Sequence, residues 1–261
     1  MTVEQPRRQD GSAGDADYGI IGKTYSDYRR PDSRIAQAVW DALGDARSVL
    51  NVGAGAGNYE PIDRDVTAVE PSASMRAQRA DSLRPAIDAV AESLPFPDHT
   101  FDAAMTTFSV HQWGDLTAGL AEIRRVTRGP VVILTCDPDL LDRFWLAEYA
   151  PDVISTERRR YPEMSELAQG LGGTVTVELV PIPLDCTDGF NEAYYGRPEE
   201  LLVAGARAAC SAWSFVEPAQ AAEYTAALGA AIDSGEWDAK YGALRQQPTF
   251  DGSLVIVRAT P

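Results

Sequence analysis

Hydrophobic and polar positions alternate along the chain in a way that predicts a parallel sheet covered by helices. From residue 48 onwards, short apolar runs typical of buried strands are separated by stretches in which apolar residues recur at helical spacing. Because each predicted strand is apolar almost throughout, both faces of the sheet should be covered, as in an α/β fold. The predicted strands are 48–53, 66–70, 87–91, 101–107 and 130–136, and the predicted helices follow Gly57, begin near residue 72 and span 116–127.

The segment before this alternation predicts a helix that leads into the sheet. Its apolar residues fall at helical spacing from Ile35 through Val39 to Leu43. Residues 1–17 are instead polar and rich in Gly and Asp, so we expect a flexible tail there, without the order of regions that marks a signal peptide.

The alternation ends after Cys136, and a different organisation follows. A helix is expected near 163–171, then a strand in "TVTVELVPIPL", Ala-rich helices within 186–248 and a last strand in "GSLVIVRAT". We expect a core of residues 18–185 and 249–261 that includes an N-terminal cap helix. The insertion 186–248 should lie over the carboxyl edge of the sheet, where open α/β sheets bind ligands, as a lid or substrate-binding region. A plain packing role is the alternative.

Composition narrows the range of partners. The formal net charge of −16 disfavours nucleic acid, whose binding depends on Lys and Arg at the phosphates. No apolar run is long enough to predict a membrane helix, so we expect a cytoplasmic protein. We also expect a monomer or homodimer that acts on a small molecule. The three cysteines stand far apart without CxxC or His clusters, and no metal site is predicted.

The glycine loop "SVLNVGAGAGNYE" at 48–60 is the first candidate for chemistry. A buried strand runs directly into Gly53, Gly55 and Gly57, a turn that needs residues without a Cβ and that a ligand can approach closely. The dinucleotide fingerprint GxGxxG would place its third glycine where Asn58 stands. Glu70, at the end of the next strand, offers two acceptor oxygens for a pair of ribose hydroxyls, which suits NAD and other adenosine cofactors alike.

Taken in order, the motifs resemble the class I S-adenosylmethionine (SAM)-dependent methyltransferases, in their small-molecule, type 11-like branch. The matching segments are "VLNVGAGAGNY", "VTAVEPSASM", "AESLPFPDHTFDAAMTTFSVHQW" and "AEIRRVTRGPVVILT". The resemblance covers about residues 48–136 and extends to the last strands. It implies a Rossmann-like, seven-stranded, mostly parallel sheet with an antiparallel last strand and helices on both faces.

The resemblance also implies how a SAM molecule would be held. The backbone of Gly53, Ala54 and Gly55 would face its amino-acid part, and Glu70 would hold the ribose. The other implied contacts are Pro71 and Ser72 beside the adenine, Ala91 and Glu92 on its other side, and Phe108 and Ser109 beside the methionine part. Many relatives carry Asp directly before the Ala–Glu pair, where this chain has Val90.

The N-terminal "YSDYRRPD" resembles the helix that folds over the cofactor in this family. Tyr18 and Tyr25 are candidates to close over the reactive methyl, and the Arg29 guanidinium is a candidate to grip the methionyl carboxylate. A surface helix that carries Tyr and Arg is the alternative.

Methyl transfer mainly requires an aligned acceptor, so no strict catalytic motif is expected. His111, just past the fourth strand, is the candidate general base or substrate contact, with a structural or cofactor-side role as the alternative. His99 lies in a polar turn and should be exposed. Asp137 and Tyr195 are weaker candidates for the base, as is Tyr194.

Aromatic residues of the two irregular regions could form an apolar substrate pocket or belong to the core; these are Trp145, Tyr149, Tyr194, Trp213 and Phe215. The predicted function is methyl transfer from SAM to O, N or C of a small molecule, in secondary metabolism. One alternative is a SAM-binding protein that acts without transfer, in cyclisation, rearrangement or sensing. An NAD-dependent oxidoreductase is disfavoured by Asn58 and by the lack of a Tyr-x-x-x-Lys pair.

Overall fold

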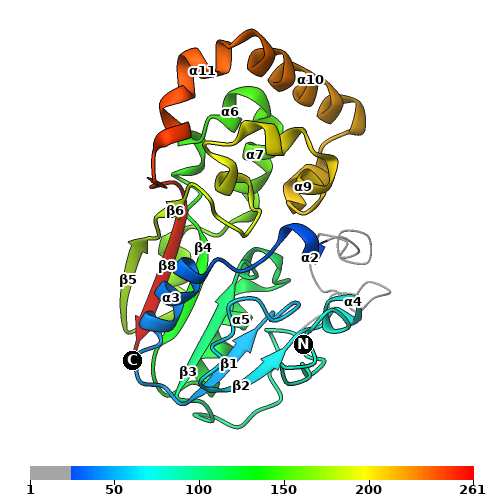
Figure 1. Ribbon diagram of the computed structural model, residues 1–261. Coiled ribbons are helices and arrows are strands. Elements are labelled where there is room, and N and C mark those ends of the chain that lie inside the picture. The colour runs from blue at the N-terminus through cyan, green and yellow to red at the C-terminus, as the bar shows by residue number, and fades with distance from the viewer. Residues whose placement is uncertain (1–24) are drawn as a thin grey trace.

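A six-stranded sheet forms the centre of the protein, for which a computed structural model describes residues 25–261 (Figure 1). The strand order is β2-β1-β3-β4-β8-β5. Neighbours are parallel from β2 to β4, whereas β8 runs antiparallel to both β4 and β5, which confirms the predicted antiparallel last strand. The strands are β1 (Ser48–Val52), β2 (Asp65–Val69), β3 (Ala103–Thr107), β4 (Val131–Cys136), β5 (Thr174–Leu179) and β8 (Leu254–Thr260).

The prediction of a seven-stranded sheet is wrong, because the described residues form a sheet of six strands. The segment predicted as a strand at 87–91 makes a single parallel bridge, between Ile87 and Val69. Pro85 precedes it and has no N–H to donate to a ladder, and Ile87 is 41% exposed, so the edge position offers little burial to extend the pairing. The chain then turns towards the carboxyl ends of the strands.

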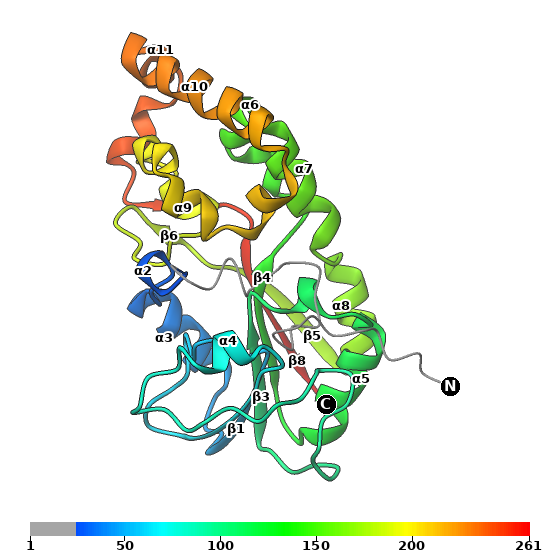
Figure 2. The same cartoon turned by 90° about the vertical axis from the view of Figure 1, so that its right-hand side faces the viewer.

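Helices cover both faces of the sheet, as the apolar strands predict (Figure 2). On one face α3 (Ser33–Ala42) buries Ile35 and Val39 against β1, β3 and β4. On the other face α5 (Leu116–Val126) and α8 (Met164–Leu171) pack against each other and share a second apolar cluster with the strands. The side chain of Asp32 accepts a hydrogen bond from the Arg34 N–H and so caps α3.

The helix predicted after Gly57 is also wrong. Residues 53–64 form turns, and the next helix along the chain is the short α4 (Ala73–Arg76). Tyr59 has a φ of 65°, outside the right-handed helical region, and Pro61 disfavours helical backbone at the residue before it. The loop that follows β1 is therefore compact and ends without a helix N-terminus.

A helical lobe, residues 141–160 and 186–248, lies beyond the carboxyl ends of the parallel strands (Figure 1). In it α6 packs on α10, and α7 packs on the 3-10 turn η6. Residues 141–160 thus join the lobe although they precede the predicted insertion. Its helices are α6 (Leu146–Tyr149), α7 (Pro151–Arg160), α9 (Ala204–Ala208), α10 (Pro218–Ser234) and α11 (Glu236–Tyr241). Its 3-10 turns are η3 (Leu141–Arg143), η4 (Asn191–Tyr194), η5 (Pro198–Leu202), η6 (Ser211–Phe215) and η7 (Gly242–Gln246).

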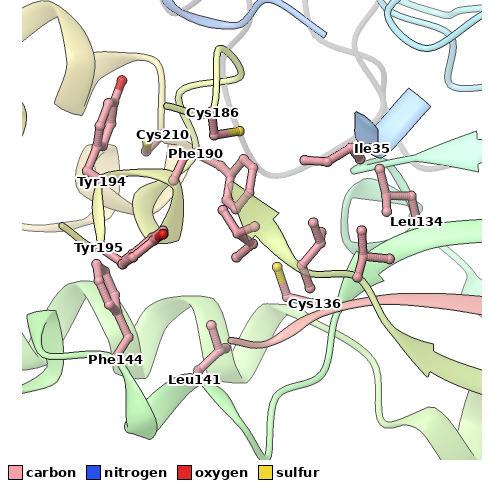
Figure 3. Packing of buried hydrophobic residues seen from close by; sticks show 14 of the residues in the cluster. Ile35, Leu134, Cys136, Leu141, Phe144, Cys186, Phe190, Tyr194, Tyr195 and Cys210 are labelled. Atoms are coloured by element: carbon pink, nitrogen blue, oxygen red, sulfur yellow. The ribbon is translucent and has the colours of Figure 1, made fainter. Parts of the chain in front are cut away.

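The lobe and the sheet share one apolar core. Figure 3 shows Leu134 and Cys136 of β4 in the same cluster as Phe144 and Tyr195 of the lobe. A two-stranded ladder of β6 (Ile182–Pro183) and β7 (Thr249–Phe250) closes the lobe at the point where the chain leaves and re-enters the sheet. Two further short elements, α2 (Tyr25–Tyr28) and the 3-10 turn η2 (Val110–Gln112), flank the carboxyl ends of the strands. None of the helices within residues 25–261 is long and apolar enough to cross a membrane.

Candidate active site

A cleft opens where β1, β2 and β3 end, with about 860 Å³ of space of which part is open to solvent. The residues that directly follow these strands, Gly53, Glu70 and Phe108, all line it. The structure brings to this cleft every predicted cofactor residue whose side chain it describes: Arg29, Gly53, Ala54, Gly55, Glu70, Pro71, Ser72, Ala91, Glu92, Phe108 and Ser109. Tyr18 lies outside the described residues, and of Tyr25 only the backbone in α2 is described.

The glycine loop packs directly against the end of β3. Gly53 has a φ of 66°, and a Cβ added there would lie 1.9 Å from the Ser109 Oγ. That hydroxyl is fixed in turn, because it accepts a hydrogen bond of 3.0 Å from the Trp113 indole nitrogen. Glycine at 53 is therefore required both by the backbone conformation and by the close approach of Ser109.

Glu70 is a buried carboxylate that organises the loop around it. Its Oε2 accepts from the Gly55 N–H and its Oε1 from the Ser72 N–H, each at 2.8 Å. Burial raises the pKa of Glu70, while these two N–H donors favour the carboxylate. A carboxylate has about four lone-pair sites, so each oxygen keeps acceptor capacity on the side that lines the cleft.

The region expected to border an adenine is mostly apolar. Met75, Val90 and Ala91 line this part of the cleft. Glu92 also lines it, and its Oε1 accepts from the Asp115 N–H at 3.0 Å. The Val90 side chain supplies no hydrogen-bonding group, whereas Glu92 and backbone groups of this wall can make polar contacts.

Arg29 enters from the segment after α2 and is held by the helical lobe. Its Nε lies 2.5 Å from the Asp188 Oδ1, and the Tyr59 hydroxyl donates to the other oxygen of Asp188 at 2.6 Å. Arg29 is 8% exposed and Asp188 is fully buried. The Arg29 guanidinium also lies over the Phe108 ring, 5.0 Å from its centroid. The predicted grip on a methionyl carboxylate stays a prediction, since this guanidinium already has a carboxylate partner.

A second cleft, with about 420 Å³ of space of which part is open to solvent, shares Arg29 and Phe108 with the first. The other walls come from η2, from the end of α7 and from the lobe segment around Phe190 and Asn191. Phe108 is the wall common to both clefts, and its φ of 50° is a conformation that non-glycine residues rarely adopt. Unusual backbone of this kind gathers at functional sites, and it fixes the ring between the two spaces.

His111 lies in this second cleft, as its predicted role requires. Its ring centroid is 4.5 Å from that of Tyr161. Burial, together with the positive charges of Arg160 and Arg29, holds the pKa of His111 well below its usual value. The imidazole is therefore neutral at pH 7 and only weakly basic.

The second cleft contains polar residues that were not predicted from the sequence, among them Glu157, Tyr161 and Asn191. Glu157 Oε1 accepts from the Asn191 amide at 2.9 Å, across residues far apart in the chain. Burial raises the pKa of Glu157 to about 7. In the sequence Glu157 stands before three arginines on a polar helix, so no local signal separates it from a solvated acid.

The predicted aromatic substrate residues line neither cleft. Trp145 is buried and donates to the Tyr195 carbonyl at 2.8 Å, and Tyr149 packs edge-on against it. Tyr194 is buried as well. Trp213 is buried beside the second cleft, where its indole donates to the Asn191 Oδ1 at 3.0 Å.

The remaining candidates also lie outside the cleft walls. The Tyr195 hydroxyl donates to the Gln247 carbonyl at 2.6 Å, and Asp137 Oδ1 accepts from the Asp139 N–H. Phe215 is 44% exposed with the Arg160 guanidinium over its ring. His99 is exposed, as predicted.

Comparison with known proteins agrees with this geometry. Residues 50–133 match the family model of a methyltransferase domain. A solved structure of a candidate methyltransferase from an antibiotic biosynthesis pathway of Anabaena variabilis ATCC 29413 is 29% identical with a TM-score of 0.82, covering 90% of this chain and 99% of that one. A [4+2]-cyclase shares the fold at 18% identity and a TM-score of 0.54, covering 99% of this chain and 98% of its own.

Among curated proteins, the malonyl-[acyl-carrier protein] O-methyltransferase of Pseudescherichia vulneris is 31% identical over 121 residues, 43% of this chain and 48% of that protein. The chain spans about half or less of the length of the curated relatives that it matches. Residues 50–133 are thus a methyltransferase domain, and the fold, with its glycine loop followed by an acidic strand end, is similar to that of the class I SAM-dependent methyltransferases.

Proposed function

We propose that this protein transfers a methyl group from SAM to an O, N or C atom of a small-molecule acceptor. The observation that carries the proposal is the pair of adjoining clefts. One is built from the glycine loop and Glu70, and the other contains polar groups suited to an acceptor. Because Arg29 and Phe108 belong to both, a group bound in one cleft adjoins a group bound in the other.

The residues of the first cleft fit SAM. Glu70 keeps acceptor capacity for two ribose hydroxyls, Met75 and Val90 suit an adenine ring, and the loop at Gly53 and Gly55 leaves room for the amino-acid part. When bound, SAM supplies a methyl group made electrophilic by the sulfonium. The protein's contribution is to hold the acceptor in line with that methyl, which can account for most of the rate enhancement.

The same cleft suits a dinucleotide poorly. Dinucleotide sites rest the pyrophosphate on the N-terminus of the helix that follows the glycine loop. Here the loop is followed by turns, and the Asn58 side chain donates to the Arg29 carbonyl at 3.2 Å. Asn58, which stands where the fingerprint has its third glycine, thus links the segment around Arg29 to the loop.

We assign the second cleft to the acceptor, with His111 as a residue that contacts it. The helical lobe would close this side of the site and exclude water, which strengthens the electrostatic interactions inside. Because lobe and sheet share an apolar core, we expect local opening around the segment 186–191 and α2 rather than movement of the whole lobe.

The setting we propose is secondary metabolism. It rests on the similarity to the Anabaena protein, which aligns over nearly its whole length. The fold alone does not separate transfer from other uses of it, since the [4+2]-cyclase shares it.

Isothermal calorimetry tests the proposal. The purified chain should bind SAM and S-adenosylhomocysteine (SAH) with micromolar affinity and should not bind NAD. Binding of NAD alone, or of none of the three, would contradict the proposal. Label transfer from methyl-labelled SAM to acceptors then separates an enzyme from a protein that only binds the cofactor.

A further inference from the structure

We propose that Glu157 is the proton acceptor of the reaction and that the molecule bound beside it in the second cleft is a phenol. This inference rests on the proposed methyl transfer and names the acceptor class of that same site. It is carried by the way Glu157 is anchored, by the charges around it and by the rings that line the cleft with it.

Glu157 is anchored through one oxygen only. Trp213 donates to the Asn191 Oδ1 at 3.0 Å, which fixes the orientation of the amide, and the Asn191 Nδ2 then donates to Glu157 Oε1 at 2.9 Å. Among residues 25–261 no hydrogen bond reaches Glu157 Oε2. A carboxylate held through one oxygen, with its other oxygen unbonded and its side chain in the wall of a cleft, is arranged to accept a proton from a bound molecule.

Its protonation behaviour suits the task better than that of His111. Burial raises the pKa of Glu157 to about 7, near the pH at which a general base is most effective. His111 is held neutral and weakly basic by burial and by the two arginines, so it serves as a contact rather than as the base. Asn191 and Trp213 are positioning residues, because they act through Glu157.

The charges around the cleft favour the ionised form of Glu157. The guanidinium groups of Arg29 and Arg160 act on both Glu157 and His111. Although Arg29 is paired with Asp188, both groups lower the pKa of Glu157 and so favour the carboxylate, which is the form that takes a proton from a hydroxyl. The titratable and charged groups that interact electrostatically with Glu157 are Arg29, Arg160, Cys136, Tyr161, Glu192 and Cys210.

The walls point to an aromatic hydroxyl rather than an aliphatic one. Phe108, Phe190, Tyr161 and the His111 ring line the same small space as Glu157. Phe108 packs on Phe190 and His111 packs on Tyr161, so a compact aromatic ring would bind against these two pairs of rings rather than between the members of a pair. The hydroxyl of that ring would meet Glu157 Oε2.

The step balances without a further reactant. The phenolic O–H bond breaks and its proton passes to Glu157 Oε2. The oxygen forms a bond to the methyl carbon while the electron pair of the sulfur–methyl bond stays on the sulfur. The products are the methyl ether, SAH and a protonated Glu157, which returns its proton to solvent.

The test uses the full chain and methyl-labelled SAM with three kinds of probe: catechol and substituted phenols, benzylamine, and benzoate. We expect label on phenolic oxygen. Glu157→Gln should lower kcat by about 100-fold or more, in the range of general-base catalysis, with SAH affinity by calorimetry unchanged. Glu178→Gln, the same change at an exposed site on β5, is the matched control and should behave like the wild type.

A second readout separates a proton acceptor from a merely structural residue. kcat should fall below about pH 7 as Glu157 becomes protonated. The hydrogen bond from Asn191 favours the carboxylate form of Glu157. Asn191→Leu removes it, so the pKa of Glu157 should rise and the decline in kcat should move to higher pH. Carbon-13 NMR of the Glu157 carboxyl, assigned by its loss in Glu157→Gln, should show the same shift in the absence of turnover.

The outcomes are distinct. If the wild type does not bind SAH, the proposed methyl transfer itself is overturned. If SAH binds normally but label appears only on benzylamine or benzoate, or on no phenol, this inference is overturned and the proposed methyl transfer stands. The same holds if Glu157→Gln is as active as the wild type.

Discussion

Glu70 and Glu157 are carboxylates of the two adjoining clefts, the first buried and the second half-buried, and they differ in how far the sequence reveals them. Glu70 follows a buried strand and stands in register with a glycine loop, so local sequence alone predicts its place. Glu157 is oriented by a hydrogen bond from Asn191, a residue of the lobe that is distant in the chain. A contact of that kind leaves no periodic or local pattern to read.

We expect Glu70→Ala to weaken SAM binding roughly 10- to 100-fold, because hydrogen bonds from the ribose hydroxyls to the carboxylate are lost. Calorimetry measures this, with Glu178→Ala on the exposed edge strand as the control. Because Glu70 also accepts from the Gly55 and Ser72 N–H groups, the thermal midpoint should fall as well. An affinity equal to that of the wild type would remove Glu70 from the cofactor site.

At the scale of elements, the segment after α2 is joined to the lobe across the mouth of both clefts. Arg29 and Asp188 form an antiparallel bridge, the Gly189 N–H donates to the Tyr28 carbonyl at 2.9 Å, and the two side chains form a buried ion pair. This joint fixes Arg29 in the wall that the two clefts share.

We expect Asp188→Asn to lower the free energy of unfolding by about 3–5 kcal/mol, since it removes the carboxylate charge of a buried ion pair with Arg29. Tyr59→Phe removes one hydrogen bond to the same carboxylate and should cost only about 1–2 kcal/mol. Urea unfolding measures both. Equal and small losses in the two variants would show that the ion pair is not what holds the segment to the lobe.

The elements that the sequence predicted correctly are those with strong periodicity. The apolar strands of the sheet, together with α3, α5 and α8, fall close to their expected bounds. The helix after Gly57 and the strand at 87–91 failed because single residues overrode the pattern. Tyr59 takes a left-handed conformation, and the edge position of Ile87 supports one bridge rather than a ladder.

At the scale of the whole molecule, the lobe and the sheet are coupled through a buried acid. Glu192 of η4 is 2% exposed and accepts from the Ser253 N–H and hydroxyl at the start of β8, at 3.0 and 2.6 Å. Burial raises its pKa from the ordinary 4.5 to about 7. The sequence predicts Ala-rich helices within 186–248, but it holds no sign of this contact, which again joins distant segments.

The raised pKa predicts how stability depends on pH. Between about pH 4.5 and 7 the folded state binds more protons than the unfolded state, so the free energy of unfolding falls as pH rises through this window. For Glu192 the loss is about 3 kcal/mol, and Glu157 adds a loss of the same sign. Urea unfolding at about pH 5 and about pH 8 should show the decline, and Glu192→Gln should flatten it. Because the lowered pKa of His111 gives a change of the opposite sign below about pH 6.5, the decisive quantity is the difference between the wild type and Glu192→Gln; the same pH dependence in both would contradict the raised pKa of Glu192.

A crystal structure of the full chain with SAH would locate the cofactor. We expect the ribose hydroxyls within hydrogen-bonding distance of Glu70, the adenine between Met75 and Val90, and the sulfur towards Phe108, facing the second cleft. A nucleoside bound elsewhere, or one whose ribose does not meet Glu70, would contradict the assignment of the glycine-loop cleft as the SAM site.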